Sequence, residues 1–144
     1  MQNFPHHYKV KGITSDCGEV SLSSEGVTDI TSALPKQFGG LGNRWSPESL
    51  LVAAVADCFI LTFKAIARAS KFDWVSLECD VEGILDKHNK TTMFIEFHMK
   101  AVLSVACGTN NDLAYALLEK SEHSCLITNS LSGKALLSIE VNEV

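Results

Sequence analysis

The stretch "NRWSPESLLVAAVADCFILTF", residues 43–63, decides the fold of this chain. It contains a strong helix start, because Ser46 can cap free backbone amides, Pro47 tolerates the first helical position and the acid Glu48 suits the positive helix end. The apolar residues that follow lie almost all round the helix, which indicates burial on most sides. We therefore predict a long central helix over residues 47–69.

Asp57 and Cys58 interrupt the longest apolar run of the chain, Leu50 to Phe63. The run is shorter than the roughly 20 residues that span a bilayer, so we expect a core helix and no membrane partner. Successive helical residues are turned about 100° from each other. Asp57 is therefore expected to face a different neighbour from Cys58, and we assign it no catalytic role.

Short alternating segments precede the helix. Residues 8–11 and 20–22 alternate between apolar and polar side chains, and "VTDITSA" continues the pattern, which predicts three strands in a β-meander. The segment "PKQFGGLGN" supplies a proline and three glycines, typical of a flexible loop that leads into the helix.

Longer alternating segments follow the helix. Residues 75–82 and 93–100 each read as a strand with one solvated face, joined by the polar turn "DKHNK". An amphipathic helix in "TNNDLAYALLEKSE" and a final strand over residues 137–141 complete the chain. The order βββ–α–ββ–α–β predicts an α+β protein with an antiparallel sheet packed on the long helix.

Length and composition are those of an ordinary globular protein. The chain has 144 residues, 46% hydrophobic and 20% charged, so we expect one domain over residues 1–144. The net charge of -5 and the scattered basic residues argue against a nucleic-acid partner. The N-terminus "MQNFPHHYKV" lacks the features of a signal peptide, so we expect a cytoplasmic location.

The central helix predicts an oligomer. A sheet covers only one side of a helix, and this helix is apolar almost all round, so another surface must cover the opposite side. For a chain of this length the simplest solution is a homodimer that buries the two long helices together.

The cysteine pattern points to thiol chemistry rather than to a disulfide framework. Five cysteines form an odd set without a CxxC pair or zinc-ligand spacing: Cys17, Cys58, Cys79, Cys107 and Cys125. We therefore expect no structural metal and no bound cofactor. A functional cysteine in this chain should act as a redox group or as a nucleophile.

Cys58 needs a positive charge nearby to act as a nucleophile, because it lies too far inside the helix for the helix dipole to stabilise its thiolate. Otherwise it is simply a small buried residue. Arg44, in the loop before the helix, is the best-placed cation, although it could equally be a surface residue stacked on Trp45. Glu48 could orient Arg44 by a bidentate ion pair, or could be an ordinary first-turn acid.

Distance along the helix separates these groups within one chain. Glu48 precedes Cys58 by ten residues, which is roughly 15 Å along the helix axis. A common site therefore needs Glu48, and with it Arg44, from a second copy of the chain, which places the site at a dimer interface. His123 lies two residues before Cys125, and residues two apart do not face each other on a helix, so a Cys–His pair is disfavoured.

The segments "SPESLLVAAVADCF" and "HSCLITNSL" together resemble the OsmC/Ohr family of osmotically inducible and organic-hydroperoxide-resistance proteins. The resemblance implies an intertwined α+β homodimer with two interface sites. It also implies a thiol peroxidase in which Cys58 attacks a hydroperoxide and becomes a sulfenic acid, and Cys125 condenses with it to a disulfide. An external dithiol, lipoyl-type in the organic-hydroperoxide branch, would then reduce this disulfide.

Two positions depart from the family pattern. The organic-hydroperoxide branch carries its activating arginine in the first hairpin turn, where this chain has "SDCG" with Cys17, so Arg44 is expected to take that role. The family also tends to have proline directly after the second cysteine, where this chain has Leu126. These departures indicate a divergent OsmC-like member.

Two other functions fit the same residues. The fold could bind a small apolar or acyl ligand in the interface cleft, with its cysteines incidental. Alternatively, Cys58 alone could serve a thiol–disulfide or acyl-transfer enzyme without peroxidase turnover, in which case Cys125 would be dispensable.

Overall fold

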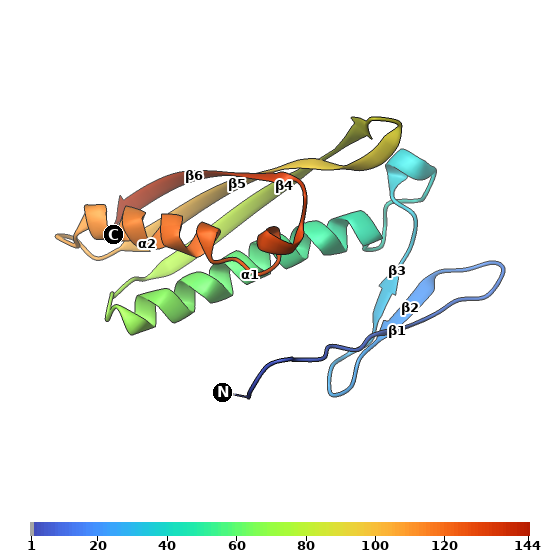
Figure 1. The fold of residues 1–144 in the computed structure, drawn as a ribbon, viewed down its shortest axis with the longest axis horizontal. Helices are drawn as coiled ribbons and strands as arrows, with labels where there is room; N and C mark the ends of the chain where they lie inside the picture. The colour runs from blue at the N-terminus through green and yellow to red at the C-terminus, as the bar shows by residue number, and fades with distance from the viewer. Residues whose placement is uncertain (1) are drawn as a thin grey trace. The chain divides into compact units, whose positions relative to one another are not determined.

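The structure is a computed structural model that describes residues 2–144. The chain divides into two compact units, one up to Leu50 and one over Leu51–Val144, and the elements of each are labelled in Figure 1. Each unit is described by itself below. The expectation of one domain over residues 1–144 stays a prediction.

The first unit is a small antiparallel sheet followed by the start of the long helix. Its strands β1 (Lys11–Ile13), β2 (Val20–Ser23) and β3 (Ile30–Ser32) pair in chain order, as the meander prediction required. The short 3-10 helix η1 (Lys36–Phe38) lies in the predicted loop. No hydrophobic side chain among residues 2–50 is fully buried; the two buried residues there are Ser32 and Ser46. This unit therefore has no hydrophobic core of its own.

The second unit contains most of the long helix α1 (Pro47–Ala69) and a sheet of three long strands. The strands β4 (Ser76–His88) and β5 (Thr91–Val105) form one antiparallel hairpin. Asn89 and Lys90 both have positive φ and make the tight turn, as in two-residue hairpin loops that match the strand twist. The turn is shorter than predicted because β4 extends through His88.

The last strand, β6 (Lys134–Glu143), pairs with β5 in parallel. The prediction of a purely antiparallel sheet was wrong at this one pair, although the α+β class is confirmed. The reason lies in α2 (Asn111–His123) and the short η2 (Thr128–Ser130), which carry the chain back along the sheet. The chain therefore enters β6 at the end where β5 began, as a helical crossover requires.

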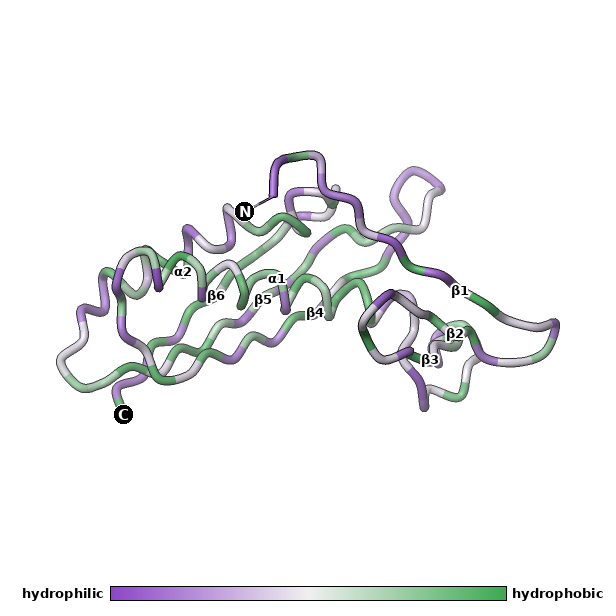
Figure 2. The backbone as a smooth tube through the Cα atoms, turned by 90° about the horizontal axis from the view of Figure 1, so that it is seen from below, coloured by the Kyte–Doolittle hydropathy of each residue, from purple (hydrophilic) through white to green (hydrophobic). Residues whose placement is uncertain are grey.

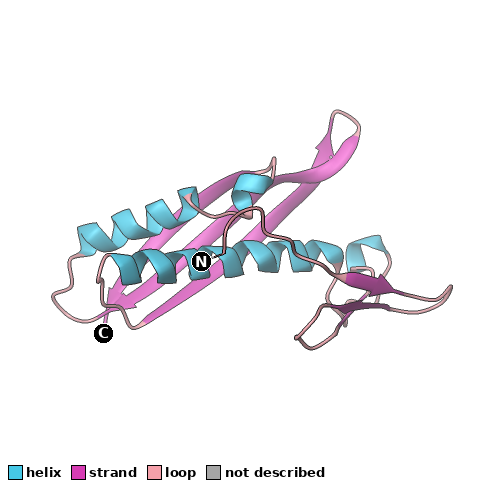
Figure 3. Ribbon diagram, turned by 60° about the horizontal axis from the view of Figure 1, so that its bottom comes forward, coloured by secondary structure: helices cyan, strands magenta, loops and turns pink. Residues whose placement is uncertain are grey.

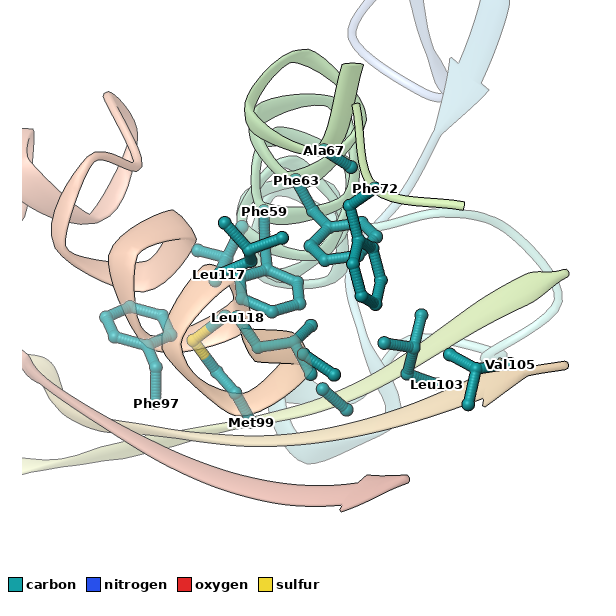
Figure 4. Close-up of a cluster of buried hydrophobic side chains, with 13 residues drawn as sticks. Phe59, Phe63, Ala67, Phe72, Phe97, Met99, Leu103, Val105, Leu117 and Leu118 are labelled. Carbon is teal, nitrogen blue, oxygen red and sulfur yellow. The ribbon is translucent and has the colours of Figure 1, made fainter. Parts of the chain in front are cut away.

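The core of the second unit lies between the two helices and one face of the sheet, as Figure 3 shows. Figure 2 shows the alternation of hydrophobic and hydrophilic residues along the strands. On β5 every second residue from Phe97 to Val105 is buried. In Figure 4 aromatic and aliphatic side chains from these layers meet. The fully buried members include Phe59, Phe63, Phe97, Leu103 and Leu118.

The helix α1 has the bounds predicted from the sequence, and it is fully buried along a single stripe. Four residues spaced four apart have no exposed surface: Val55, Phe59, Phe63 and Ala67. This spacing places them on one helix face, toward the sheet. By length and composition α1 would also be able to cross a membrane, but this buried stripe is the pattern of a core helix. The rest of its apolar surface, including Leu61 at 54% exposed, is incompletely covered within this chain.

Candidate active site

Cys58 lies in the second unit, on the incompletely covered side of α1. It lines a groove of about 610 Å³ between α1 and the segment that follows α2. The Sγ atom of Cys58 lies 4.0 Å from the hydroxyl of Thr62, one helical turn further on. The groove walls are mostly aliphatic: Ala54, Leu61, Ala65, Ile66, Leu126 and Ile127. This half-buried thiol therefore faces an open, largely apolar space.

Cys125 lies just behind this groove and is fully buried. Burial is the main reason why the pKa of the Cys125 thiol is raised, while hydrogen bonds from Thr128 oppose this shift. The neighbouring Cys58 thiol raises the pKa of Cys125 further. The structure thus brings together the two cysteines that the sequence singled out, although they are far apart along the chain.

The end of α2 fixes the position of Cys125. The helix begins with Asn110, whose side chain accepts a hydrogen bond from the amide of Leu113, and it ends at His123. Cys125 follows two residues later, and its carbonyl accepts hydrogen bonds from the Asn129 amide at 3.0 Å and the Thr128 hydroxyl at 3.2 Å. These bonds hold the backbone of Cys125 in a tight turn next to α1.

His123 is not a partner of Cys125. Its Nδ1 atom lies 2.7 Å from the backbone carbonyl of Glu119, and its side chain is exposed. This hydrogen bond, together with the charge of Glu122, raises the pKa of His123. This geometry agrees with the prediction that His123 and Cys125 do not form a pair.

Arg44 lies in the first unit and pairs with Glu19. Its Nε atom is 3.0 Å from the Glu19 carboxylate, and both side chains are about half exposed. The ion pair between Arg44 and Glu48 that the sequence suggested is absent within this chain. The cause is local: a bridge between Ser32 and Trp45 holds the loop against β3, and places Arg44 within reach of Glu19, the residue before β2.

Glu48 has a different position in the same unit. Its Oε2 atom is buried and has no hydrogen-bond partner among the described residues. It does not cap the helix, because Ser46 and Ser49 cap it reciprocally: the Ser46 hydroxyl accepts from the Ser49 amide, and the Ser49 hydroxyl accepts from the Ser46 amide. A buried acceptor without a partner is costly.

Two groove residues were misjudged or missed from the sequence. Asp57 was expected to face a different neighbour from Cys58, but both line this groove. The reason is that the groove is broad enough to include two helix positions about 100° apart. Lys120, on α2, also lines it and was missed, because nothing in its local sequence distinguishes it from other helix-surface lysines. Among residues 2–144, no cluster of three or more His, Cys, Asp or Glu side chains is arranged to hold a metal ion.

The sequence and the fold of this chain agree with one protein family. The sequence pattern of the OsmC-like protein family matches residues 40–140, so the chain belongs to that family. The uncharacterized protein YmaD of Bacillus subtilis is 28% identical, and the match covers 95% of this chain and 94% of YmaD.

Solved structures show the same fold. An OsmC-like protein of unknown function from Vibrio cholerae superposes with a TM-score of 0.84 at 17% identity, over 94% of this chain and 99% of that one. An organic hydroperoxide resistance protein, OsmC, from Legionella pneumophila gives a TM-score of 0.72 at 22% identity, over 97% and 99%. The α+β fold expected from the OsmC/Ohr resemblance is thereby confirmed.

Proposed function

We propose that this protein is a cysteine-based peroxidase that reduces organic hydroperoxides. The Cys58 thiolate attacks the O–O bond, which releases the alcohol and leaves Cys58 as a sulfenic acid. The Cys125 thiol then condenses with it, which forms a disulfide and releases water. The observation that carries the proposal is the position of Cys58, in an apolar groove directly beside the buried thiol of Cys125.

The different environments of the two thiols support this division of roles. Cys58 is in contact with the groove, whereas Cys125 has no exposed surface. A substrate in the groove can therefore reach Cys58 first, and Cys125 reacts only with a product formed on its neighbour. The aliphatic walls favour a hydroperoxide with an organic substituent. The name of the related Legionella protein, an organic hydroperoxide resistance protein, supports the same substrate class.

The active unit that we propose is a homodimer with two composite sites. Among residues 2–50 no hydrophobic side chain is fully buried, and α1 is fully buried along one stripe only. Both surfaces need cover, and a second copy of the chain supplies it. In this arrangement Glu48 and Arg44 of one chain complete the site around Cys58 of the other. At this composite site, the Oε2 atom of Glu48, which has no hydrogen-bond partner among the described residues, would accept a hydrogen bond from the guanidinium of Arg44.

Mixing two inactive variants tests the composite site. Cys58→Ser lacks the thiol and Arg44→Ala lacks the cation that stabilises the thiolate, so each variant alone should be slow. After the chains are mixed, dissociated and reassembled, half of the dimers are mixed and carry one intact site of two, so we expect about a quarter of the parental peroxidase rate. The rate is measured as loss of cumene hydroperoxide in the presence of a dithiol.

Two outcomes contradict the composite site. If native mass spectrometry shows mixed dimers but the peroxidase rate is not recovered, Arg44 does not act on Cys58 of the other chain. If the protein is purely monomeric at micromolar concentration, the proposed homodimer is wrong. The control is an equal mixture of Cys58→Ser with Cys107→Ser, in which the second chain keeps all the proposed site residues and needs no complementation.

The Cys125→Ser variant should separate the two steps of the reaction. We expect it to consume one equivalent of cumene hydroperoxide at nearly the parental rate, because Cys58 is unchanged. It should then stop as a Cys58 sulfenic acid, which dimedone traps, because no resolving thiol is present. Turnover with a lipoyl-type dithiol, the external reductant that we propose, should fall sharply. A Cys125→Ser protein that turns over like the parent would point to a thiol enzyme that uses Cys58 alone.

The direct test of the peroxidase is a stoichiometric titration. The reduced chain is mixed with one equivalent of cumene hydroperoxide, free thiols are counted, and disulfides are mapped by mass spectrometry. We expect the loss of two thiols and a single disulfide between Cys58 and Cys125. An unchanged thiol count would lead us to abandon the peroxidase.

The same groove also favours a second candidate, a binding protein for a small apolar or acyl ligand. Its volume of about 610 Å³ lies in the usual range of ligand pockets. In that case native mass spectrometry should detect a retained ligand, and Cys58→Ala should bind it as the parent does. Peroxide-dependent loss of thiols would be absent.

A further inference from the structure

Lys120 is a cation in a groove whose walls are mostly aliphatic. It comes from α2, and it lines the same groove as Cys58. Among residues 2–144 it forms no ion pair. Its own helix face offers no acidic partner either, because none of the residues three and four positions away carries a carboxylate: Ala116, Leu117, His123 and Ser124. The ammonium group of Lys120 is therefore available to an anion that enters the groove.

The order of the elements shows where Lys120 lies along the groove. α1 ends before β4 begins, and α2 begins after β5 ends. The start of β4 pairs with the end of β5, so the end of α1 and the start of α2 lie at the same end of the sheet. The two helices therefore run in opposite directions, as Figure 1 shows. Lys120 comes first in the chain among the residues of its groove wall, so it lies toward the Ile66 end, whereas Cys58 lies nearer to the Ala54 end.

The acid that lines this groove, Asp57, lies on the opposite wall. Asp57 and Phe59 are the neighbours of Cys58 on α1, and they point about 100° to either side of it. Phe59 belongs to the stripe that faces the sheet, so Asp57 points away from the sheet, at the outer edge of the groove. No ion pair joins Asp57 and Lys120. An anion at the α2 wall therefore meets the charge of Lys120 first.

We propose that Lys120 is a specificity-determining residue that selects organic hydroperoxides bearing a carboxylate, an inference that rests on the proposed peroxidase function. The apolar body of such a substrate lies along the aliphatic walls, with its peroxide group at Cys58 and its carboxylate at the ammonium group of Lys120. The charged groups add charge-assisted hydrogen bonds to the apolar contacts. The chemical step is unchanged: the O–O bond breaks, Cys58 becomes a sulfenic acid, and the alcohol that leaves keeps its carboxylate.

The length of the groove limits the size of the preferred substrate. Eight residues of α1 separate Cys58 from Ile66, which is about 12 Å along the helix axis. The peroxide and the carboxylate of a substrate should be closer together than this distance. A benzene ring that carries the two groups in para positions meets this limit, and its faces match the apolar walls.

The test compares two derivatives of cumene hydroperoxide that differ in charge but hardly in size, the para-carboxylate and the para-carboxamide. The value of kcat/KM is measured for each with the full chain and a dithiol in excess. We expect the parent to prefer the carboxylate about tenfold, because a hydrogen bond between charged groups is stronger than one to a neutral amide. The difference should lie mainly in KM, since the contact is made before the chemical step as well as during it. High ionic strength should reduce it.

Variants of Lys120 test whether its charge causes the preference. Lys120→Met keeps an unbranched apolar stem and a similar helix propensity, and its ratio of the two kcat/KM values should fall to about one. Lys120→Arg should keep the preference, and Lys120→Glu should invert it. The matched control is Lys87→Met, which removes the same charge from an exposed lysine of β4 that does not line the groove. It should prefer the carboxylate as the parent does.

The outcomes separate this inference from the peroxidase itself. If the parent reduces both substrates equally well, the role of Lys120 is wrong and the peroxidase stands. If the preference persists in Lys120→Met, another cation such as Arg44 provides it, and the role of Lys120 is again wrong. If neither substrate is consumed, the peroxidase fails, and the role of Lys120 fails with it. Because each ratio is measured on one preparation, it does not depend on how much of a variant is folded.

Discussion

The Cys58→Ser variant is expected to lose nearly all hydroperoxide reduction. The serine hydroxyl keeps the size of the side chain but supplies no thiolate, so the step that breaks the O–O bond has no nucleophile. Removal of an attacking nucleophile costs about a thousandfold or more in rate. The measurement is the initial rate of cumene hydroperoxide loss with a dithiol in excess.

Cys107→Ser is the matched control, because Cys107 is an exposed thiol that is not part of the proposed Cys58–Cys125 pair. It should retain the parental rate. If both variants lost the same share of the rate, the loss would not be specific to Cys58, and a dedicated site at Cys58 would be refuted. An unchanged rate in Cys58→Ser would mean that another residue is the nucleophile.

The Phe59→Ala variant is expected to lower the free energy of unfolding more than any change in the groove. Phe59 has no exposed surface and lies in the centre of the stripe that α1 buries. Truncation removes its transfer free energy and leaves a cavity between the helix and the sheet, at a cost of about 3–5 kcal/mol. The shift of the urea unfolding midpoint at constant slope measures this loss.

Lys64→Ala, on the exposed side of the same helix, controls for helix propensity and should change the midpoint little. If Phe59→Ala does not fold, Phe59→Leu keeps most of the apolar volume and should show a smaller shift in the same direction. A midpoint for Phe59→Ala equal to that of the parent would mean that α1 does not pack on the sheet as described.

The long elements were predictable because their signals are local. The signal at Ser46 and Pro47 located the start of α1, and strict alternation located β4 and β5. The parallel pairing of β6 was not predictable in the same way. Its alternation is that of any strand, and its direction depends on where α2 delivers the chain.

The sequence singled out Cys58 and Cys125, but it did not predict the ion pair that Arg44 makes. Cys58 and Cys125 stand out as the cysteines of a recognisable motif, and the structure places them side by side. Arg44, by contrast, pairs with Glu19, a residue far from it in sequence. Helical geometry also did not predict that Asp57 and Cys58 line the same groove. A groove wall between two elements can include more than one helix position.

At the start of α1, the residues that cap the helix are different from the residue proposed for the site. Ser46 and Ser49 satisfy each other's amides, so the cap hydrogen bonds of the first turn need no charged side chain. Glu48 stands between them and contributes nothing to the cap. A substitution at Glu48 can therefore change the chemistry of the proposed site without removing the hydrogen bonds that start the helix.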